Sequence, residues 1–275
     1  MEASCQFVMS AGHPHLSGYS TGTTQTACVP ISVRCTDVPA LRRPKTVTKL
    51  TAHRQTAADK HEEIAMTFIE TATGGTAAGT VARLYAEDVA DQGYVANYTR
   101  VFALRPEVLA GWAQLNGAIK HGMDLRRYEL ATLATARALR STYCAMAHGR
   151  VLRDRFYDPE TVRRITTDHT HAGLTPAEVA VMDFADQVAR DATSIGPDDI
   201  QRLRAHGLSD TDILDVALAA AARCFFSTVL DAMGAQADGA LSEDLEPPLR
   251  AALTVGRAPQ PSDRPRALPA VQEAS

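Results

Sequence analysis

Helix start signals recur through the middle of the chain, and no stretch sustains the two-residue alternation of apolar and polar side chains that strands need. Thr175 and Glu178 stand at the spacing of a capping box, with a proline at the first helical position after Thr175. Ser209 and Asp212 repeat the start signal before a long apolar run, and Asp124 is placed to cap another long helix. These signals predict an all-α fold.

The composition agrees with close-packed helices. Aromatic residues make up 5% of the chain and hydrophobic residues 45%, and the abundant alanine favours helices over strands. The formal net charge of -4, without a basic stripe, excludes a typical nucleic-acid surface. The most apolar stretch, residues 213–226, is interrupted by Asp215 and Arg223, so we expect no membrane span.

The cysteines indicate a reducing compartment. The chain has five, at Cys5, Cys28, Cys35, Cys144 and Cys224. Their odd number and irregular spacing do not form a disulfide framework. The N-terminus lacks the basic and apolar segments of a secretory signal. We therefore expect a cytoplasmic protein.

Three regions are predicted along the chain. Residues 1–65 are rich in Ser and Thr and have no sustained helical period, which is typical of a disordered extension. A second interpretation is that translation starts at Met66. Residues 66–255 form the predicted helical domain. Residues 256–275 contain four prolines and are expected to be a disordered tail.

The helical region contains two segments whose sequences resemble each other, an internal similarity. Sliding the sequence over itself by 86 residues places Asp124 on Asp210 and Ser141 on Ser227. Either the domain consists of two related helical halves, or two alanine-rich helices resemble each other by composition alone. At this offset Cys144 falls on a leucine, so only the first segment keeps reactive side chains.

Cys144 and His148 are the main candidates for chemistry. Four residues apart on a helix, they share one face and can touch. An imidazole can take the proton of a thiol, and the thiolate is the reactive form of cysteine. Glu129 can orient that imidazole if the preceding helix packs alongside. The alternative is that Cys144 is a small buried apolar residue and Glu129 a solvated one.

Ser141 adds a second reason to consider Cys144. If Ser141 caps a new helix, Cys144 lies in its first turn, where unpaired amide groups carry partial positive charge. That position favours the thiolate over the thiol. The sequence thus predicts a thiol that ionises easily.

This segment resembles the signature of the alkylhydroperoxidase D-like proteins, in which Glu-x(11)-Cys-x-x-Cys-x-x-x-His carries the chemistry. The chain keeps the spacing as Glu129-x(11)-Ser141-x-x-Cys144-x-x-x-His148. Residues 64–257 also resemble the peroxidase-related branch of the carboxymuconolactone decarboxylase-like superfamily. The resemblance implies a compact multi-helix fold of that type.

The resemblance also implies roles for these residues. Cys144 matches the peroxide-attacking cysteine, His148 the histidine that activates it, and Glu129 the distal member of a proton relay. Ser141 stands where the resolving cysteine should be, and a serine cannot form a disulfide with a sulfenic acid. Either an outside thiol resolves the sulfenate, or Cys224 does, or the reaction is different. Cys224 is expected to be a buried structural thiol.

Other polar residues have weaker assignments. Tyr143, Tyr98 and Asn97 are candidate substrate-binding residues, with packing roles as the equal alternative. His169 and His171 lack a spaced cysteine or carboxylate partner, so no metal site is predicted. No cofactor is expected.

The sequence therefore predicts a thiol-dependent hydroperoxide reductase. The expected partners are a small hydroperoxide or carboxylate substrate, an external thiol reductant and further copies of the chain, without nucleic acid or membrane. One alternative is a decarboxylase, lyase or isomerase in which His148 and Glu129 transfer protons. Another is a non-catalytic oligomeric binding protein.

Overall fold

The structure is a computed structural model that describes residues 67–72, 75 and 77–261. The predictions for residues 1–65, and for the tail beyond residue 261, lie outside this part of the chain. The described residues form α-helices and two short 3-10 helices, without a strand. The elements are α1 (Gly79–Gln92), α2 (Asn97–Phe102), α3 (Pro106–Gly122), α4 (Leu125–Ala138), α5 (Thr142–Arg155), α6 (Pro159–Asp168), η1 (His169–His171), α7 (Pro176–Asp191), η2 (Ala192–Ser194), α8 (Pro197–Ala205), α9 (Asp210–Ala232), α10 (Gly239–Glu243) and α11 (Pro247–Leu253).

The predicted start signals act as helix caps. Thr175 caps α7 in a complete capping box with Glu178, and Ser209 does the same for α9 with Asp212. The Asp124 side chain accepts a hydrogen bond from the backbone of the first turn of α4. Each cap satisfies backbone amides that a helix start leaves without partners. The all-α prediction is confirmed.

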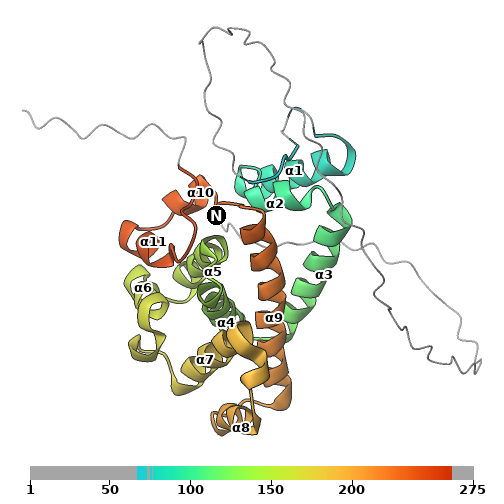
Figure 1. Ribbon diagram of the computed structural model, residues 1–275. Coiled ribbons are helices and arrows are strands. Elements are labelled where there is room, and N and C mark those ends of the chain that lie inside the picture. Colours follow the sequence, from blue (N-terminus) through green and yellow to red (C-terminus); the bar gives the residue numbers. More distant parts are fainter. Residues whose placement is uncertain (1–66, 73–74, 76, 262–275) are drawn as a thin grey trace, which may run out of the picture. The chain divides into compact units, whose positions relative to one another are not determined.

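Helix α4 lies at the centre of the described core. It packs against α5, α7 and α9, and α9 in turn packs against α3 (Figure 1). Leu130 and Leu133 are fully buried, and so are Ala131 and Ala136. Alanine on a helix face allows neighbouring helices to approach closely, because its side chain ends at Cβ. This close packing brings the side chains of α4, α5 and α9 into one small region.

Helix α9 is the longest and most apolar element. Its length and mean hydropathy of 1.8 would suit a membrane span, but 50% of its most apolar window is buried against the rest of the protein. The helix also carries the buried Arg223. Its burial against α3, α4 and α7 is that of a core helix.

Helix α4 ends at a tight turn that starts α5. Arg140 adopts a left-handed conformation with φ of 58°. The N–H of Ser141 donates to Ala136 O at 2.8 Å, and the N–H of Arg140 donates to Arg137 O at 3.0 Å. These two bonds form a Schellman motif, in which arginine occupies a position usually given to glycine. The turn makes Ser141 the N-cap residue of the next helix, α5.

The two segments with similar sequences differ in structure at this turn. Ser141 precedes α5, whereas Ser227, its counterpart at the same offset, is buried inside the continuous helix α9. The chain therefore reverses after the first alanine-rich segment and runs straight on after the second.

The segment after α11 returns to the α4–α5 turn. The N–H of Gly256 donates to Thr142 Oγ1 at 2.9 Å. A Cβ placed on Gly256 would lie 1.9 Å from Arg140 O, so only glycine fits here. Further along, the N–H of Gln260 donates to Ala237 O at 2.8 Å. The predicted tail thus begins in a segment that contacts the start of α5.

Candidate active site

The start of α5 places Cys144 in the first helical turn. Ser141 is the N-cap residue by position, and its carbonyl accepts from Ala145 N–H at 2.9 Å. Its side chain, fully buried, makes no capping hydrogen bond, so Ser141 occupies the cap position through its backbone alone. Cys144 is nevertheless the third residue of the helix, among first-turn amides that favour an anion.

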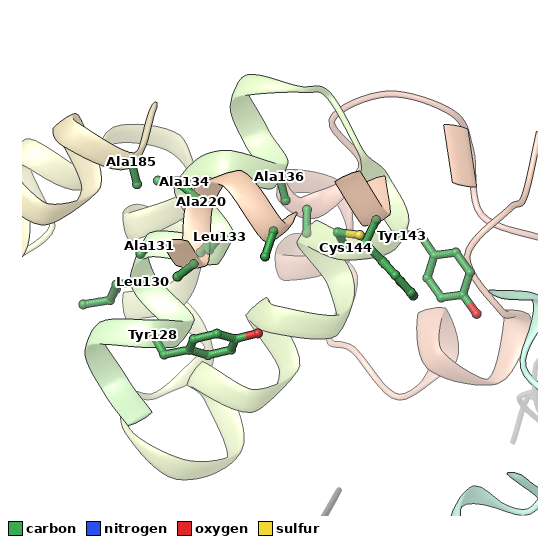
Figure 2. Close-up of a cluster of buried hydrophobic side chains, with 14 of the residues drawn as sticks. Tyr128, Leu130, Ala131, Leu133, Ala134, Ala136, Tyr143, Cys144, Ala185 and Ala220 are labelled. Atoms are coloured by element: carbon green, nitrogen blue, oxygen red, sulfur yellow. The ribbon is translucent and has the colours of Figure 1, made fainter. Parts of the chain in front are cut away.

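The sulfur of Cys144 is buried beside a guanidinium group. Cys144 is 2% exposed. The Nη1 of Arg223, from α9, donates to the Cys144 Sγ at 3.7 Å. Figure 2 shows Tyr128 and Cys144 in the same buried cluster, with the Tyr143 ring on the other side of Cys144. The thiol therefore has a cationic donor that comes from a distant part of the sequence.

Arg223 is held on several sides. Its Nη2 donates to the Tyr128 hydroxyl at 3.4 Å, which in turn donates to Asn116 Oδ1 at 2.6 Å. The guanidinium carbon lies 5.5 Å from the Trp112 ring centroid and 5.4 Å from that of Phe226. Such cation–π contacts stabilise a buried cation. The guanidinium is thus fixed in place at the sulfur.

Glu129 and His148 form a buried pair between α4 and α5. Nδ1 of His148 lies 2.6 Å from Glu129 Oε2, and Lys120 Nζ lies 3.3 Å from Glu129 Oε1. Burial, followed by the charge of Arg223, lowers the pKa of His148 to about 4. Burial alone would raise the pKa of Glu129, but His148 and Lys120 outweigh it and lower that pKa. At neutral pH the pair is a carboxylate and a neutral imidazole.

The hydrogen bond to Glu129 selects the tautomer of His148. A carboxylate only accepts hydrogen bonds, so Nδ1 carries the proton and Nε2 keeps its lone pair. Among the hydrogen bonds of the described residues, none joins His148 to Cys144, and the sulfur is bonded to Arg223 instead. The predicted direct thiol–imidazole contact is therefore not found, because the ring is drawn to α4 by the carboxylate.

The candidate substrate-binding residues lie in a separate polar network. The Tyr143 hydroxyl donates to Asp238 Oδ2 and accepts from the Tyr98 N–H at 3.3 Å. The backbone N–H of Asn97 donates to Asp238 Oδ1 at 2.9 Å, and its side-chain amide donates to Gln236 O at 3.1 Å. Burial raises the pKa of Asp238 to about 6. This network joins α2, α5 and the loop before α10.

The remaining candidates, His169, His171 and Cys224, take no part in the hydrogen bond that the structure describes at the Cys144 sulfur. His169 pairs with Asp183 and His171 with Asp168, each at 2.7 Å. Within the described ranges, no group of three His, Cys, Asp or Glu side chains is placed to hold a metal ion. Cys224 is half-buried, and burial raises the pKa of its thiol.

Cys144 lines neither of two cavities found in the described part of the chain. One, of about 340 Å³, lies between α7 and α8 and includes Phe184 and His206 in its lining. The other, of about 500 Å³, is lined by residues of α10, α11 and the segment 259–261. Cys144 itself is buried, so the side chains packed around the sulfur limit the access of a substrate to it.

Sequence reasoning missed Arg223 as a site residue, although a signal was present. The buried positions of α9 include Val216, Ala220, Ser227 and Leu230, which follow a helical repeat. Arg223 stands at that repeat, where a charged residue is rarely found without a partner. A charge on the apolar face of a helix was the observation that could have identified it.

Comparisons with known proteins agree with the fold. Residues 106–187 match the model of the Carboxymuconolactone decarboxylase family, and this segment contains Glu129, Cys144 and His148. No curated protein matches the sequence. The chain resembles the alkylhydroperoxidase AhpD core structure of an uncharacterized peroxidase-related protein from Ralstonia eutropha JMP134, with a TM-score of 0.57 and 20% identity over 70% of this chain and 98% of that one.

Two further solved structures share this fold. An uncharacterized peroxidase-related protein from Silicibacter sp. TM1040 has a TM-score of 0.53 and 22% identity, over 58% of this chain and 87% of that one. The debrominase Bmp8 has a TM-score of 0.52 and 15% identity, over 70% of this chain and 97% of its own. This chain therefore has the alkylhydroperoxidase D-like fold, and its residues 106–187 match the family model that agrees with the resemblance of its motif.

Proposed function

We propose that this protein is a thiol-dependent hydroperoxide reductase with Cys144 as its nucleophile. The observation that carries the proposal is the placement of the Cys144 sulfur in the first turn of α5, against the guanidinium of Arg223. Both features stabilise a thiolate. His148, one turn further along α5 and bonded to the buried Glu129 of α4, supplies a proton acceptor.

The proposed reaction begins with the thiol proton passing to Nε2 of His148. The thiolate attacks the terminal oxygen of the hydroperoxide, so that an S–O bond forms and the O–O bond breaks. The leaving alkoxide takes the proton from His148 and departs as an alcohol, or as water when the substrate is hydrogen peroxide. Cys144 is oxidised to a sulfenic acid, and Glu129 holds the imidazole throughout.

An external thiol completes the cycle, because Ser141 cannot act as a resolving residue. The outside thiolate attacks the sulfenic acid sulfur, which releases water and leaves a mixed disulfide. A second outside thiol then releases the Cys144 thiol and forms the external disulfide. Cys224 is a poor substitute, since the raised pKa of its thiol disfavours thiolate.

The test is intact mass spectrometry after stoichiometric hydroperoxide, with a reagent that traps sulfenic acids. We expect a single trapped adduct that maps to Cys144 and is lost in Cys144→Ser. Cys224→Ser is the matched control and should keep the adduct. An unmodified Cys144 after peroxide treatment would overturn the proposal and favour a non-catalytic binding protein.

A lyase, decarboxylase or isomerase is the second candidate. It is favoured by the Glu129–His148 pair, which is complete without the thiol and leaves a neutral imidazole nitrogen for proton transfer. Cys144→Ser separates the two functions, because proton transfer should survive the change and peroxide reduction should not. The debrominase Bmp8 shares the fold, and a structure of its C82A variant holds 2,3,4-tribromopyrrole, so this compound belongs in the substrate panel.

We also propose that the protein forms a homo-oligomer. Leu214, Leu218 and Phe225 are between 40% and 57% exposed along one side of α9, and Leu115 on α3 is 51% exposed. Light scattering during size-exclusion chromatography should give a mass above 29.5 kDa. Leu218→Glu should shift it toward that value if this side is the interface. The cytoplasmic location remains a prediction.

A further inference from the structure

Arg223 is a buried cation without a carboxylate partner. It is 6% exposed, and among the ion pairs of residues 67–261 that the structure describes, none includes it. Its hydrogen bonds go to the Cys144 sulfur and the Tyr128 hydroxyl. A charge removed from water is strongly unfavourable unless a counter-charge or strong hydrogen bonds compensate it.

The nearby acidic groups do not provide that counter-charge. Glu129, on α4, is bonded to His148 and paired with Lys120. Tyr128 donates its own proton to Asn116 Oδ1, which makes its oxygen a neutral acceptor toward Arg223. The aromatic rings beside the guanidinium offer only partial negative charge.

The sulfur of Cys144 is the one remaining contact that can become an anion. It lies 3.7 Å from Nη1 of Arg223, and both groups are excluded from water. Besides Cys144, the titratable groups that interact with Arg223 are Tyr128 on α4, His148 on α5 and the adjacent Cys224 on α9. Glu129 and Lys120 interact with His148. In a dry environment, two opposite charges at this separation attract far more strongly than at the surface.

We propose that Arg223 is the permanent counter-cation of the Cys144 thiolate and a catalytic residue of the site. The inference deepens the proposed function and rests on it for its catalytic part. The ion pair stabilises the thiolate that forms when the thiol proton passes to His148, and His148 then carries that proton to the leaving oxygen. Arg223 lies beyond the segment 106–187 that matches the family model, so that match does not cover it.

The test is a titration of thiolate by ultraviolet absorbance in the full chain. The five cysteines all contribute, so the Cys144 signal is the difference between each protein and its Cys144→Ser counterpart. Arg223→Met keeps the volume and removes the charge. We expect the midpoint of Cys144 thiolate formation to rise, so that the thiolate fraction at neutral pH falls roughly tenfold for each unit of change. Arg223→Lys should restore most of it.

Arg257→Met is the matched control. Arg257 also lies over an aromatic ring, that of Phe68, at 4.7 Å, and its Nη2 donates to Asp231 O at 3.3 Å. This variant should leave the Cys144 midpoint unchanged. Circular dichroism identifies any variant that fails to fold, and Arg223→Lys then carries the test through its smaller shift in midpoint.

The two proposals fail in different ways. An unchanged midpoint in folded Arg223→Met and Arg223→Lys would overturn the ion pair, whether or not peroxide is reduced. An Arg223-dependent midpoint in a protein whose Cys144 gives no sulfenic acid would support the ion pair and overturn the peroxidase function.

Discussion

Nδ1 of His148 lies 2.6 Å from Oε2 of Glu129, although the two residues are 19 positions apart in the sequence. The contact fixes the imidazole in one tautomer and one orientation. It also leaves Nε2 as the proton acceptor. Orientation of a catalytic imidazole by a buried carboxylate is a recurrent device of enzymes, and its loss lowers turnover without unfolding the protein.

Glu129→Gln should slow the oxidation of Cys144 by hydroperoxide by roughly 100-fold, because the amide no longer enforces the Nδ1–H tautomer. Stopped-flow measurement of peroxide consumption would give the rate. Glu107→Gln is the control, since Glu107 is an exposed carboxylate on α3 paired with Arg105. Equal rates in the two variants would exclude the proposed relay.

The pH dependence of stability should reflect His148. Burial lowers its pKa from 6.5 to about 4 in the folded state. As the pH falls from 6.5 to about 4, the unfolded chain binds a proton at this imidazole and the folded protein does not. The free energy of unfolding therefore decreases on acidification. The group contributes about 3 kcal/mol to this loss. Urea unfolding at several pH values should show a smaller acid-induced loss in His148→Gln than in the wild type.

Asp238 should act in the opposite direction. Burial raises its pKa from 3.8 to about 6 in the folded state, so its contribution to stability is complete below 3.8 and is lost as the pH rises through 6. Asp238→Asn keeps an acceptor for Tyr143 and removes the titration. Relative to the wild type, this variant should gain stability as the pH rises from 4 to 7. A constant difference between the two proteins would contradict the assignment.

Gly256→Ala should destabilise the protein. The added Cβ would lie 1.9 Å from the carbonyl oxygen of Arg140, which belongs to a backbone turn that cannot move aside. We expect a loss of about 2 kcal/mol or more, seen as a lower Tm. Gly117→Ala is the control, because an added Cβ there meets nothing within 4 Å on helix α3. That control should be neutral or stabilising.

The burial of the thiol gives a prediction about reagents. Cys144 is 2% exposed, so a bulky thiol reagent should react with it slowly in the native protein and rapidly in urea. Hydrogen peroxide should oxidise it faster than a bulky aromatic hydroperoxide. Intact mass over time would follow both reactions. Equal rates for the two peroxides would show that access does not limit the reaction.

Features that depend on neighbouring residues could be predicted from the sequence. The capping boxes at Thr175 and Ser209 each operate across three residues, and the first-turn position of Cys144 follows from the end of one helix and the start of the next. The family motif added the Glu129–His148 pair, which spacing alone left open.

Contacts between distant segments could not be predicted in the same way. Arg223 reaches Cys144 across 79 positions, and Tyr143 reaches Asp238 across 95. The sequence leaves Tyr143 as a candidate for substrate binding or for packing, and the carboxylate that engages its hydroxyl is one that only the tertiary fold brings near. The order of residues along the chain does not show which distant side chains the tertiary fold brings into contact.

The left-handed turn at Arg140 sets the rotation of α5 about its own axis, and so the direction of each side chain on that helix. One residue advances a helix by about 100° of rotation. Inserting or deleting a single residue between Leu139 and Ser141 would therefore aim the sulfur and the imidazole at different neighbours, even if both helices stayed intact. The eleven-residue gap between Glu129 and Ser141 therefore decides which neighbours the sulfur and the imidazole face.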